Sequence, residues 1–350
     1  MADLFSPLKV GDLTLKNRII MAPLTRCRAS EGRVPNGLMA QYYSQRATAG
    51  LIVTEATIVD PMGAGYPDTP GIYSEAQVNG WRNVTDSVHN AGGLIFCQLW
   101  HVGRISHESY LDGKAPVAPS AIKAEGHVSL VRPKVGYPTP RALETSEVPQ
   151  VVEAFTKGAQ NAKDAGFDGV EIHAANGYLI DQFLQDSTNK RTDPYGGSIE
   201  NRARFLLEIV DGCIGVWGAG RVGVHLAPRA DAHDMGDSDR RALFTYVAQE
   251  LDKRGIAFVF TREHVADDSL TPAIKKAFHG VVISNESLDK ATAEKLLDDG
   301  KADAVAFGKL FIANPDLPQR LAQDAPLNDW DVATFYGGGE KGYTDYPALF

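Results

Sequence analysis

Residues 164–179 read DAGFDGVEIHAANGYL and contain the features that decide the fold. An amphipathic stretch ends at Asp164-Ala165-Gly166, and a glycine after the last helical turn is a common helix stop. The short apolar run Gly169–His173 follows, and its length is typical of a buried strand. Polar residues begin where this run ends. The stretch therefore predicts the end of a helix, a buried strand and a polar loop at the strand's carboxyl end.

The same succession of short apolar runs and longer helical patterns extends along the chain. The helical patterns include Gln150–Ala165, Ser198–Val216 and Asp239–Arg254. The expected strands are Arg18–Ala22, Leu51–Glu55, Leu94–Gln98, Gly169–His173, Arg221–Leu226, Ile256–Phe260, Gly280–Ile283 and Val305–Phe307. Buried strands that alternate with helices indicate parallel βαβ units, and eight of them favour an α/β fold of the (β/α)₈ TIM-barrel type. The pattern alone leaves a doubly wound open sheet as the alternative.

Two segments interrupt this succession. Leu4–Leu15 predicts an N-terminal β-hairpin, which could close the bottom of the barrel. Residues 103–145 are rich in Gly, Pro, Ser and Lys, and a loop insertion of this size in a compact domain is usually functional. Because the insertion comes after the third expected strand, we expect it to cover the mouth of a site at the carboxyl ends of the strands. The length of 350 residues suits one barrel with insertions, so we predict a single domain over residues 1–350.

Composition excludes several classes of partner. The net charge is −9, whereas nucleic acid or an anionic membrane surface would require a basic face. The three cysteines, Cys27, Cys97 and Cys213, are too few for an iron–sulfur cluster with four thiolate ligands, and their sparse number suits a reducing compartment. We find neither a secretory signal nor an apolar run long enough to span a membrane. We therefore expect a cytoplasmic protein with no nucleic-acid or membrane partner.

Polar and small residues follow several expected strands. The active sites of α/β barrels lie at the carboxyl ends of the strands, so these residues are expected to converge. They are Ala22-Pro23-Leu24-Thr25, Glu55-Ala56, Gln98-Leu99-Trp100-His101, His173-Ala174-Ala175-Asn176, His225 and Phe307-Gly308-Lys309. Any one of them alone is explained equally well as a satisfied polar residue at a strand end. Their coincidence favours a site.

His173, Asn176 and Tyr178 form the strongest local candidate for chemistry. A histidine and an asparagine offer two hydrogen-bond donors to one oxygen, as a carbonyl or nitro group requires when negative charge develops on it. Tyr178 adds a phenolic proton for general-acid work. The local alternative is that His173 and Asn176 only cap the following helix.

Longer motifs carry a resemblance to a known family. They are Phe5-Ser6-Pro7-Leu8, Asn17-Arg18-Ile19, Met21-Ala22-Pro23-Leu24-Thr25-Arg26, Gln98-Leu99-Trp100-His101-Val102-Gly103-Arg104, residues 173–178, Asp181-Gln182-Phe183-Leu184, Arg191-Thr192-Asp193-Pro194-Tyr195-Gly196-Gly197-Ser198, Asn201-Arg202, residues 311–317 and Phe335-Tyr336-Gly337-Gly338-Gly339. With them the chain resembles the old yellow enzyme family of FMN-dependent ene-reductases. The resemblance is to its bacterial branch in particular, which includes N-ethylmaleimide reductases and nitrate ester and xenobiotic reductases. It extends over nearly the whole chain.

The resemblance implies a barrel that holds FMN tightly but non-covalently, with NADPH or NADH as co-substrate in a ping-pong cycle. Its substrates would be small electrophiles, namely enones, maleimides, nitrate esters and nitroaromatics, and the protein would be a monomer or homodimer. His173 and Asn176 would hold the substrate's electron-withdrawing oxygen, and Tyr178 would protonate the α-carbon. Tyr66, Trp100 and Tyr336 would form aromatic walls. The FMN-binding residues implied are Ala22, Pro23, Leu24, Thr25, Ala56, Gln98, His225, Asn285, Glu286, Gly308 and Lys309.

The chain departs from the family pattern in three places. His225 stands in the fifth strand where relatives usually have an arginine, so we expect a lower or pH-dependent flavin potential unless Arg229 reaches in. Where relatives often have a glycine-rich phosphate turn, this chain reads Ser284-Asn285-Glu286. The backbone N–H groups of the turn would still bind the phosphate, and the Glu286 side chain would turn away from it. Lys309 stands where an arginine is usual. Residues 257–263, at the sixth strand, lack the Tyr-x-His type of sequence that relatives usually carry there. The sequence does not explain how this difference affects substrate specificity.

Three alternatives belong to other classes. A metal-dependent barrel hydrolase could use His101, His107, His173 and His225, but the sequence has no H-x-H or HExxH spacing. A Schiff-base aldolase needs a strand-end lysine, and Lys309 fits a phosphate better. A non-catalytic flavin-binding barrel would have no use for the proton donor Tyr178.

Overall fold

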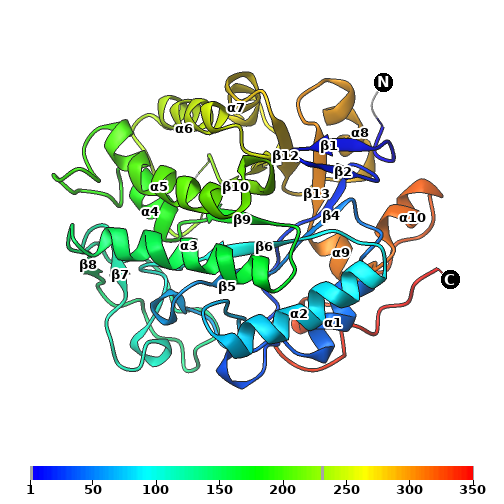
Figure 1. Ribbon diagram of the computed structural model, residues 1–350, viewed down its shortest axis with the longest axis horizontal. Helices are drawn as coiled ribbons and strands as arrows, with labels where there is room; N and C mark the ends of the chain where they lie inside the picture. The colour runs from blue at the N-terminus through cyan, green and yellow to red at the C-terminus, as the bar shows by residue number, and fades with distance from the viewer. Residues whose placement is uncertain (1–2, 230–231, 350) are drawn as a thin grey trace.

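The computed structural model describes residues 3–229 and 232–349, so residues 1–2, 230–231 and 350 of the expected domain lie outside the described residues. Its centre is a closed barrel of eight parallel strands (Figure 1). They are β3 (Ile19–Met21), β4 (Leu51–Val53), β6 (Ile95–Trp100), β9 (Gly169–Ala174), β10 (Val222–Leu226), β11 (Phe258–Arg262), β12 (Val281–Asn285) and β13 (Ala304–Phe307). Pairing of β4 with β6 closes the circle, so the (β/α)₈ prediction is confirmed and the open-sheet alternative is wrong.

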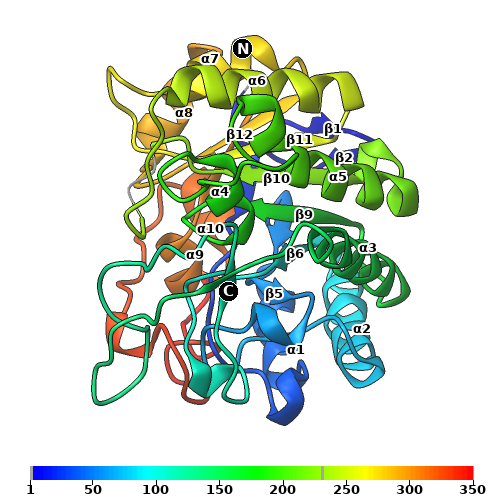
Figure 2. The same ribbon diagram turned by 90° about the vertical axis from the view of Figure 1, so that its left-hand side faces the viewer.

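Helices surround the strands, and Figures 1 and 2 show α2, α3, α5 and α6 outside the barrel. The helices are α1 (Gly37–Ser44), α2 (Glu75–Asn90), α3 (Val148–Asp164), α4 (Leu179–Leu184), α5 (Ile199–Trp217), α6 (Arg240–Arg254), α7 (Thr271–Ala277), α8 (Lys290–Asp298), α9 (Lys309–Ala313) and α10 (Leu317–Ala322). The three helices expected from sequence are α3, α5 and α6, with ends within two residues of the prediction. Their apolar faces and the outward side chains of the strands form the largest buried cluster.

The hairpin of β1 (Leu8–Val10) and β2 (Leu13–Leu15) lies at the amino-terminal end of the barrel, as expected. The Asp12 N–H donates to the carbonyl of Gly220, which precedes β10 (3.2 Å). Val10 and Leu15 belong to the same buried cluster as inward-facing barrel residues such as Leu51 and Ala304. The opposite, carboxyl end therefore remains for a site.

Inward-facing side chains alternate along each strand and become polar toward the carboxyl end. On β11 Phe258 and Phe260 lie in the barrel's inner cluster, and Arg262 follows at the same spacing. β11 begins and ends two residues later than the expected strand Ile256–Phe260, because its pairing with β12 continues to Arg262, opposite Asn285. This shift adds an arginine to the inward face.

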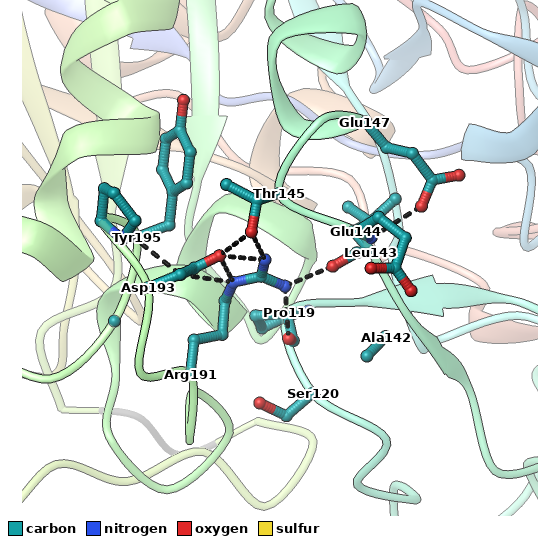
Figure 3. A network of polar contacts seen from close by, with 12 residues as sticks. Pro119, Ser120, Ala142, Leu143, Glu144, Thr145, Glu147, Arg191, Asp193 and Tyr195 are labelled. Atoms are coloured by element: carbon teal, nitrogen blue, oxygen red, sulfur yellow. Dashed lines mark hydrogen bonds and ion pairs between the residues drawn. The ribbon is translucent and has the colours of Figure 1, made fainter.

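The insertion 103–145 lies between β6 and α3 and contains only short elements, among them β7 (Val117–Ala118) and β8 (Arg141–Ala142). Arg191 holds it, as Figure 3 shows: the guanidinium donates to the carbonyls of Pro119 (3.0 Å) and Leu143 (2.5 Å) and pairs with Asp193. Asp193 in turn accepts a hydrogen bond from Thr145. The segment 120–142 of the insertion is thereby attached at both of its ends to the loop that follows α4.

Candidate active site

A cavity of about 950 Å³ opens at the carboxyl ends of the strands. Small-molecule sites commonly have volumes of about 300–1,000 Å³, so the cavity is large enough for a cofactor. Many of the site residues expected from sequence line it: Ala22, Pro23, Leu24, Thr25, Tyr66, Asn176, Tyr178, His225, Asn285, Glu286, Gly308, Lys309 and Tyr336. The remaining ones, Ala56, Gln98, Trp100 and His173, are buried beside or beneath these residues.

The turn after β9 places Asn176 and Tyr178. Asn176 has φ +58° and Gly177 has φ +75°, a left-handed pair that reverses the chain before α4 begins. A Cβ on Gly177 would lie 2.8 Å from the Cβ of His233, so this position requires glycine. The buried Asp181 accepts a hydrogen bond from the Gly177 N–H (2.8 Å) and fixes the turn. The local sequence therefore directs both side chains into the cavity.

His173 and His225 form a stacked pair within the barrel. They are register partners on β9 and β10, and their ring centroids lie 5.2 Å apart with an interplanar angle of 12°. Burial, together with His225 and Arg262, lowers the pKa of His173 well below its usual range, and burial lowers the pKa of His225 to about 3. Both imidazoles are therefore neutral near pH 7. Of the two outcomes expected from His225, this favours a lower flavin potential to which His225 adds no pH dependence near neutral pH.

Gln98 and Glu171 fix the orientation of His225 from below. The amide nitrogen of Gln98 donates to Glu171 Oε2 (2.6 Å) and to His225 Nδ1 (3.3 Å). Because an amide N–H only donates, Nδ1 accepts and the proton of His225 lies on Nε2. Burial raises the pKa of Glu171 to about 8. His225 thus offers a neutral N–H donor.

Tyr66, Trp100 and Tyr178 form an aromatic group at one side of the cavity. The hydroxyls of Tyr66 and Tyr178 are hydrogen-bonded (2.9 Å), and Trp100 meets Tyr178 edge to face at 5.0 Å. Burial raises the pKa of Tyr178 well above its usual range, so the phenol keeps its proton. Trp100 is fully buried and supports this wall from behind, whereas Tyr336 is half-exposed at the rim.

Arg262 lines the cavity and was not recognised as a site residue from sequence. Its Nη1 donates to Asn176 Oδ1 (2.8 Å), and its Nε pairs with Glu286. The signal that could have identified it is the two-residue alternation from Phe258 through Phe260. Arg229, which sequence left as a candidate cation, instead lies 2.8 Å from Asp268 and is not among the residues that line the cavity.

The turn after β12 contains two non-glycine residues with positive φ, Glu286 (+122°) and Ser287 (+53°). The Asn285 amide donates to the carbonyl of Ala306 (2.7 Å), so this side chain joins β12 to β13. The carboxylate of Glu286 faces Arg262 and pairs with its Nε. Lys309 also lines the cavity, and its ammonium lies 6.0 Å from the centroid of the Trp330 ring.

The donor set fits a flavin. His173 Nδ1 and His225 Nε2 are buried and have no hydrogen-bond partner among the described residues. A buried nitrogen without a partner is costly, so both positions are suited to a ligand. Residues 3–229 and 232–349 contain no group of three or more His, Cys, Asp or Glu side chains arranged to hold a metal ion.

The sequence profile of the NADH:flavin oxidoreductase / NADH oxidase family matches residues 3–328. The chain belongs to this family. The solved structure of morphinone reductase in complex with tetrahydroNAD is 50% identical, with a TM-score of 0.97 over 100% of this chain and 98% of that one. The old yellow enzyme homologue from Zymomonas mobilis is 46% identical, with a TM-score of 0.97 over 99% of this chain and 100% of that one.

Relatives by sequence agree with this family. 12-Oxophytodienoate reductase 1 of Oryza sativa subsp. japonica is 45% identical over 360 residues, 99% of this chain and 93% of that protein. A probable flavin mononucleotide-dependent alkene reductase of Leishmania infantum is 45% identical over 358 residues, 99% of this chain and 97% of that protein. The expected membership of the old yellow enzyme family is confirmed, and the chain is an oxidoreductase of the old yellow enzyme type. Within its described residues no helix has the length and apolar character to cross a membrane.

Proposed function

We propose that this protein is an FMN-dependent NAD(P)H ene-reductase that acts on activated C=C bonds in small enones and maleimides and also reduces nitrate esters or nitroaromatics. The observation that carries the proposal is that Asn176 and Tyr178 line one cavity and that His173 is buried beside them, with its ring centroid 5.1 Å from that of Tyr178. Two neutral donors can hold the oxygen of an electron-withdrawing group as negative charge develops on it, and a protonated phenol can supply the proton for the α-carbon. The expectations of one FMN-binding domain over residues 1–350, a monomer or homodimer and a cytoplasmic location accompany this proposal.

FMN, when bound, supplies the hydride that it has accepted from NADPH or NADH. The segment after β3 and residues Ala56, Gln98 and His225 would contact its ring system. Backbone groups at Asn285 and Glu286, with Gly308 and Lys309, would bind its phosphate. Lysine supplies one compact positive charge there rather than the two-pronged contact of an arginine.

The chain's own residues then act on the substrate. His173 and Asn176 hold its electron-withdrawing oxygen by donated hydrogen bonds, which strengthen as charge develops on that oxygen. Tyr178 donates its phenolic proton to the α-carbon, and its bond to Tyr66 holds the hydroxyl in place. Tyr66 and Tyr336 line the volume in which a planar substrate would lie.

The visible spectrum of the purified protein tests the proposal. We expect a yellow protein whose flavin band bleaches with NADPH or NADH and recovers when an enone or nitrate ester is added. A colourless protein that fails to take up FMN would contradict it. So would a reduced flavin that none of these acceptors reoxidises.

A further inference from the structure

Arg262 joins two parts of the site that are far apart in the sequence. Its guanidinium contacts Asn176, from the turn after β9, and Glu286, from the turn after β12. The side chain is only partly exposed (33%) and lines the same cavity as both partners. Two other lysines or arginines line this cavity, but Lys290 pairs with Asp324 (2.5 Å) and Lys309 lies over Trp330. Among the lysines and arginines that line the cavity, Arg262 is thus the one whose described contacts include Asn176.

The contact fixes the orientation of the Asn176 amide. An arginine has only donors, so the atom 2.8 Å from its Nη1 has to be the acceptor Oδ1. A flipped amide would place its NH₂ group against the guanidinium and lose the bond. With Oδ1 occupied, Nδ2 and its two hydrogens remain for a ligand. The backbone of Asn176 is also held, because its carbonyl lies 2.7 Å from His233 Nδ1.

Glu286 holds Arg262 in turn. The carboxylate pairs with Nε, which leaves Nη1 directed at Asn176. The second carboxylate oxygen of Glu286 lies 3.9 Å from His264 Nε2. Glu286, Arg262 and Asn176 therefore form a continuous chain of polar contacts across three strand ends.

We propose that Arg262 is a positioning residue that holds Asn176 with its Nδ2 hydrogens directed to the electron-withdrawing oxygen of the substrate. This inference rests on the proposed function and deepens it. It states that a residue outside the His173–Tyr178 segment orients the Asn176 amide toward the substrate. Arg262 acts through Asn176, and Glu286 supports it. Ligands that present an acceptor oxygen at this point gain affinity from the arrangement.

The test replaces Arg262 in the FMN-loaded enzyme and measures binding of 4-hydroxybenzaldehyde and the steady-state constants for a cyclic enone. Arg262→Met keeps most of the side-chain volume and removes the donors, so we expect the Kd and KM to rise roughly 2- to 12-fold, the range for loss of the one hydrogen bond that Asn176 donates to the ligand. FMN content and thermal midpoint should stay unchanged. Arg262→Lys should recover part of the affinity. Arg229→Met, a matched arginine that does not line the cavity, should bind like the wild type.

A double-mutant cycle with Asn176→Ala decides the mechanism of the effect. If Arg262 acts through Asn176, then Arg262→Met adds less than about twofold once Asn176 is alanine, because coupled residues are not additive. Additive effects would overturn the proposal, as would wild-type ligand affinity in Arg262→Met. Loss of FMN from both Arg262→Met and Arg262→Lys would also overturn it, because the residue would then hold the cofactor. Failure of the proposed function is seen separately, as a wild-type protein without flavin or turnover.

Discussion

The imidazole of His173 lies face to face with that of His225, in register on neighbouring strands and 5.2 Å apart. The pair is tolerated because burial keeps both rings neutral. A buried nitrogen of each ring, Nδ1 of His173 and Nε2 of His225, has no hydrogen-bond partner among the described residues. In the proposed function, His173 would donate to the substrate's oxygen and His225 would contact the flavin.

Removal of both proposed oxygen donors should separate substrate binding from cofactor binding. In His173→Ala with Asn176→Ala we expect slower enone turnover and weaker binding of 4-hydroxybenzaldehyde, while FMN content stays near that of the wild type. Each lost hydrogen bond is worth about 0.5–1.5 kcal/mol, so together they account for a fall of roughly 5- to 150-fold in affinity. Spectroscopic titration of the purified variant measures both quantities. Unchanged ligand affinity would remove these residues from the site.

Tyr178→Phe should slow the two half-reactions unequally. The variant lacks the proton for the α-carbon, and general-acid contributions are about 100- to 10,000-fold, so alkene reduction should fall within that range. Flavin reduction by NADPH or NADH should change little. Stopped-flow measurement of each half-reaction gives the ratio. Tyr66→Phe, which removes the hydroxyl 2.9 Å from that of Tyr178, is the matched control and should cause a much smaller loss.

His225→Arg should raise the flavin midpoint potential, because a permanent cation favours an anionic reduced ring. In the wild type, a pKa of about 3 means that His225 does not change charge near neutral pH. The midpoint potential should therefore show no break between about pH 5 and about pH 8 from this residue. Potentiometric titration across that range measures it. A break near pH 6.5 that disappears in His225→Gln would contradict the neutral imidazole.

Asp193→Asn should remove an acid-sensitive part of the stability. Hydrogen bonding to Arg191 lowers the pKa of Asp193 from 3.8 to about 2. A carboxyl group whose pKa is lower in the folded than in the unfolded state stabilises the fold at pH values above its unfolded-state pKa. This stabilisation is lost as pH falls from about 4 to about 2. Because part of the carboxylate faces solvent, we expect a loss of about 1–2 kcal/mol in the free energy of unfolding near neutral pH.

Thermal unfolding followed from neutral to acidic pH checks this expectation. The difference between wild type and Asp193→Asn should shrink as the carboxylate becomes protonated. Asp329→Asn, at an exposed position, is the control and should follow the wild type at every pH. A constant difference across the whole acidic range would show that charge is not the cause.

Much of the barrel could be predicted because each strand is a short apolar run between helical patterns. The expected strands overlap all eight strands of the barrel. The polar strand ends also pointed to His173, Asn176 and His225 as neighbours, since parallel strands bring their carboxyl ends to one face.

The features of the site that the sequence did not predict depend on where each strand ends and on the direction of each side chain. Composition determines neither. The sixth strand was expected to end at Phe260, and that error placed Arg262 outside the inward series. The neutrality of His225 follows from burial in the folded barrel, where its neighbour Gln98 also orients it, and the direction of the Glu286 carboxylate follows from Arg262. These contacts join residues far apart in the chain, so no local pattern contains them.

Arg191 joins two separated points of the insertion. Pro119 and Leu143 accept hydrogen bonds from the same guanidinium, so residues 120–142 form a loop with both ends fixed at one point of the scaffold. Val128 and Tyr137 within that loop pack in the same cluster as Tyr66 and Trp100. Exchange of this segment between relatives is therefore a route to reshape the aromatic side of the cavity without rebuilding the barrel that carries the cofactor.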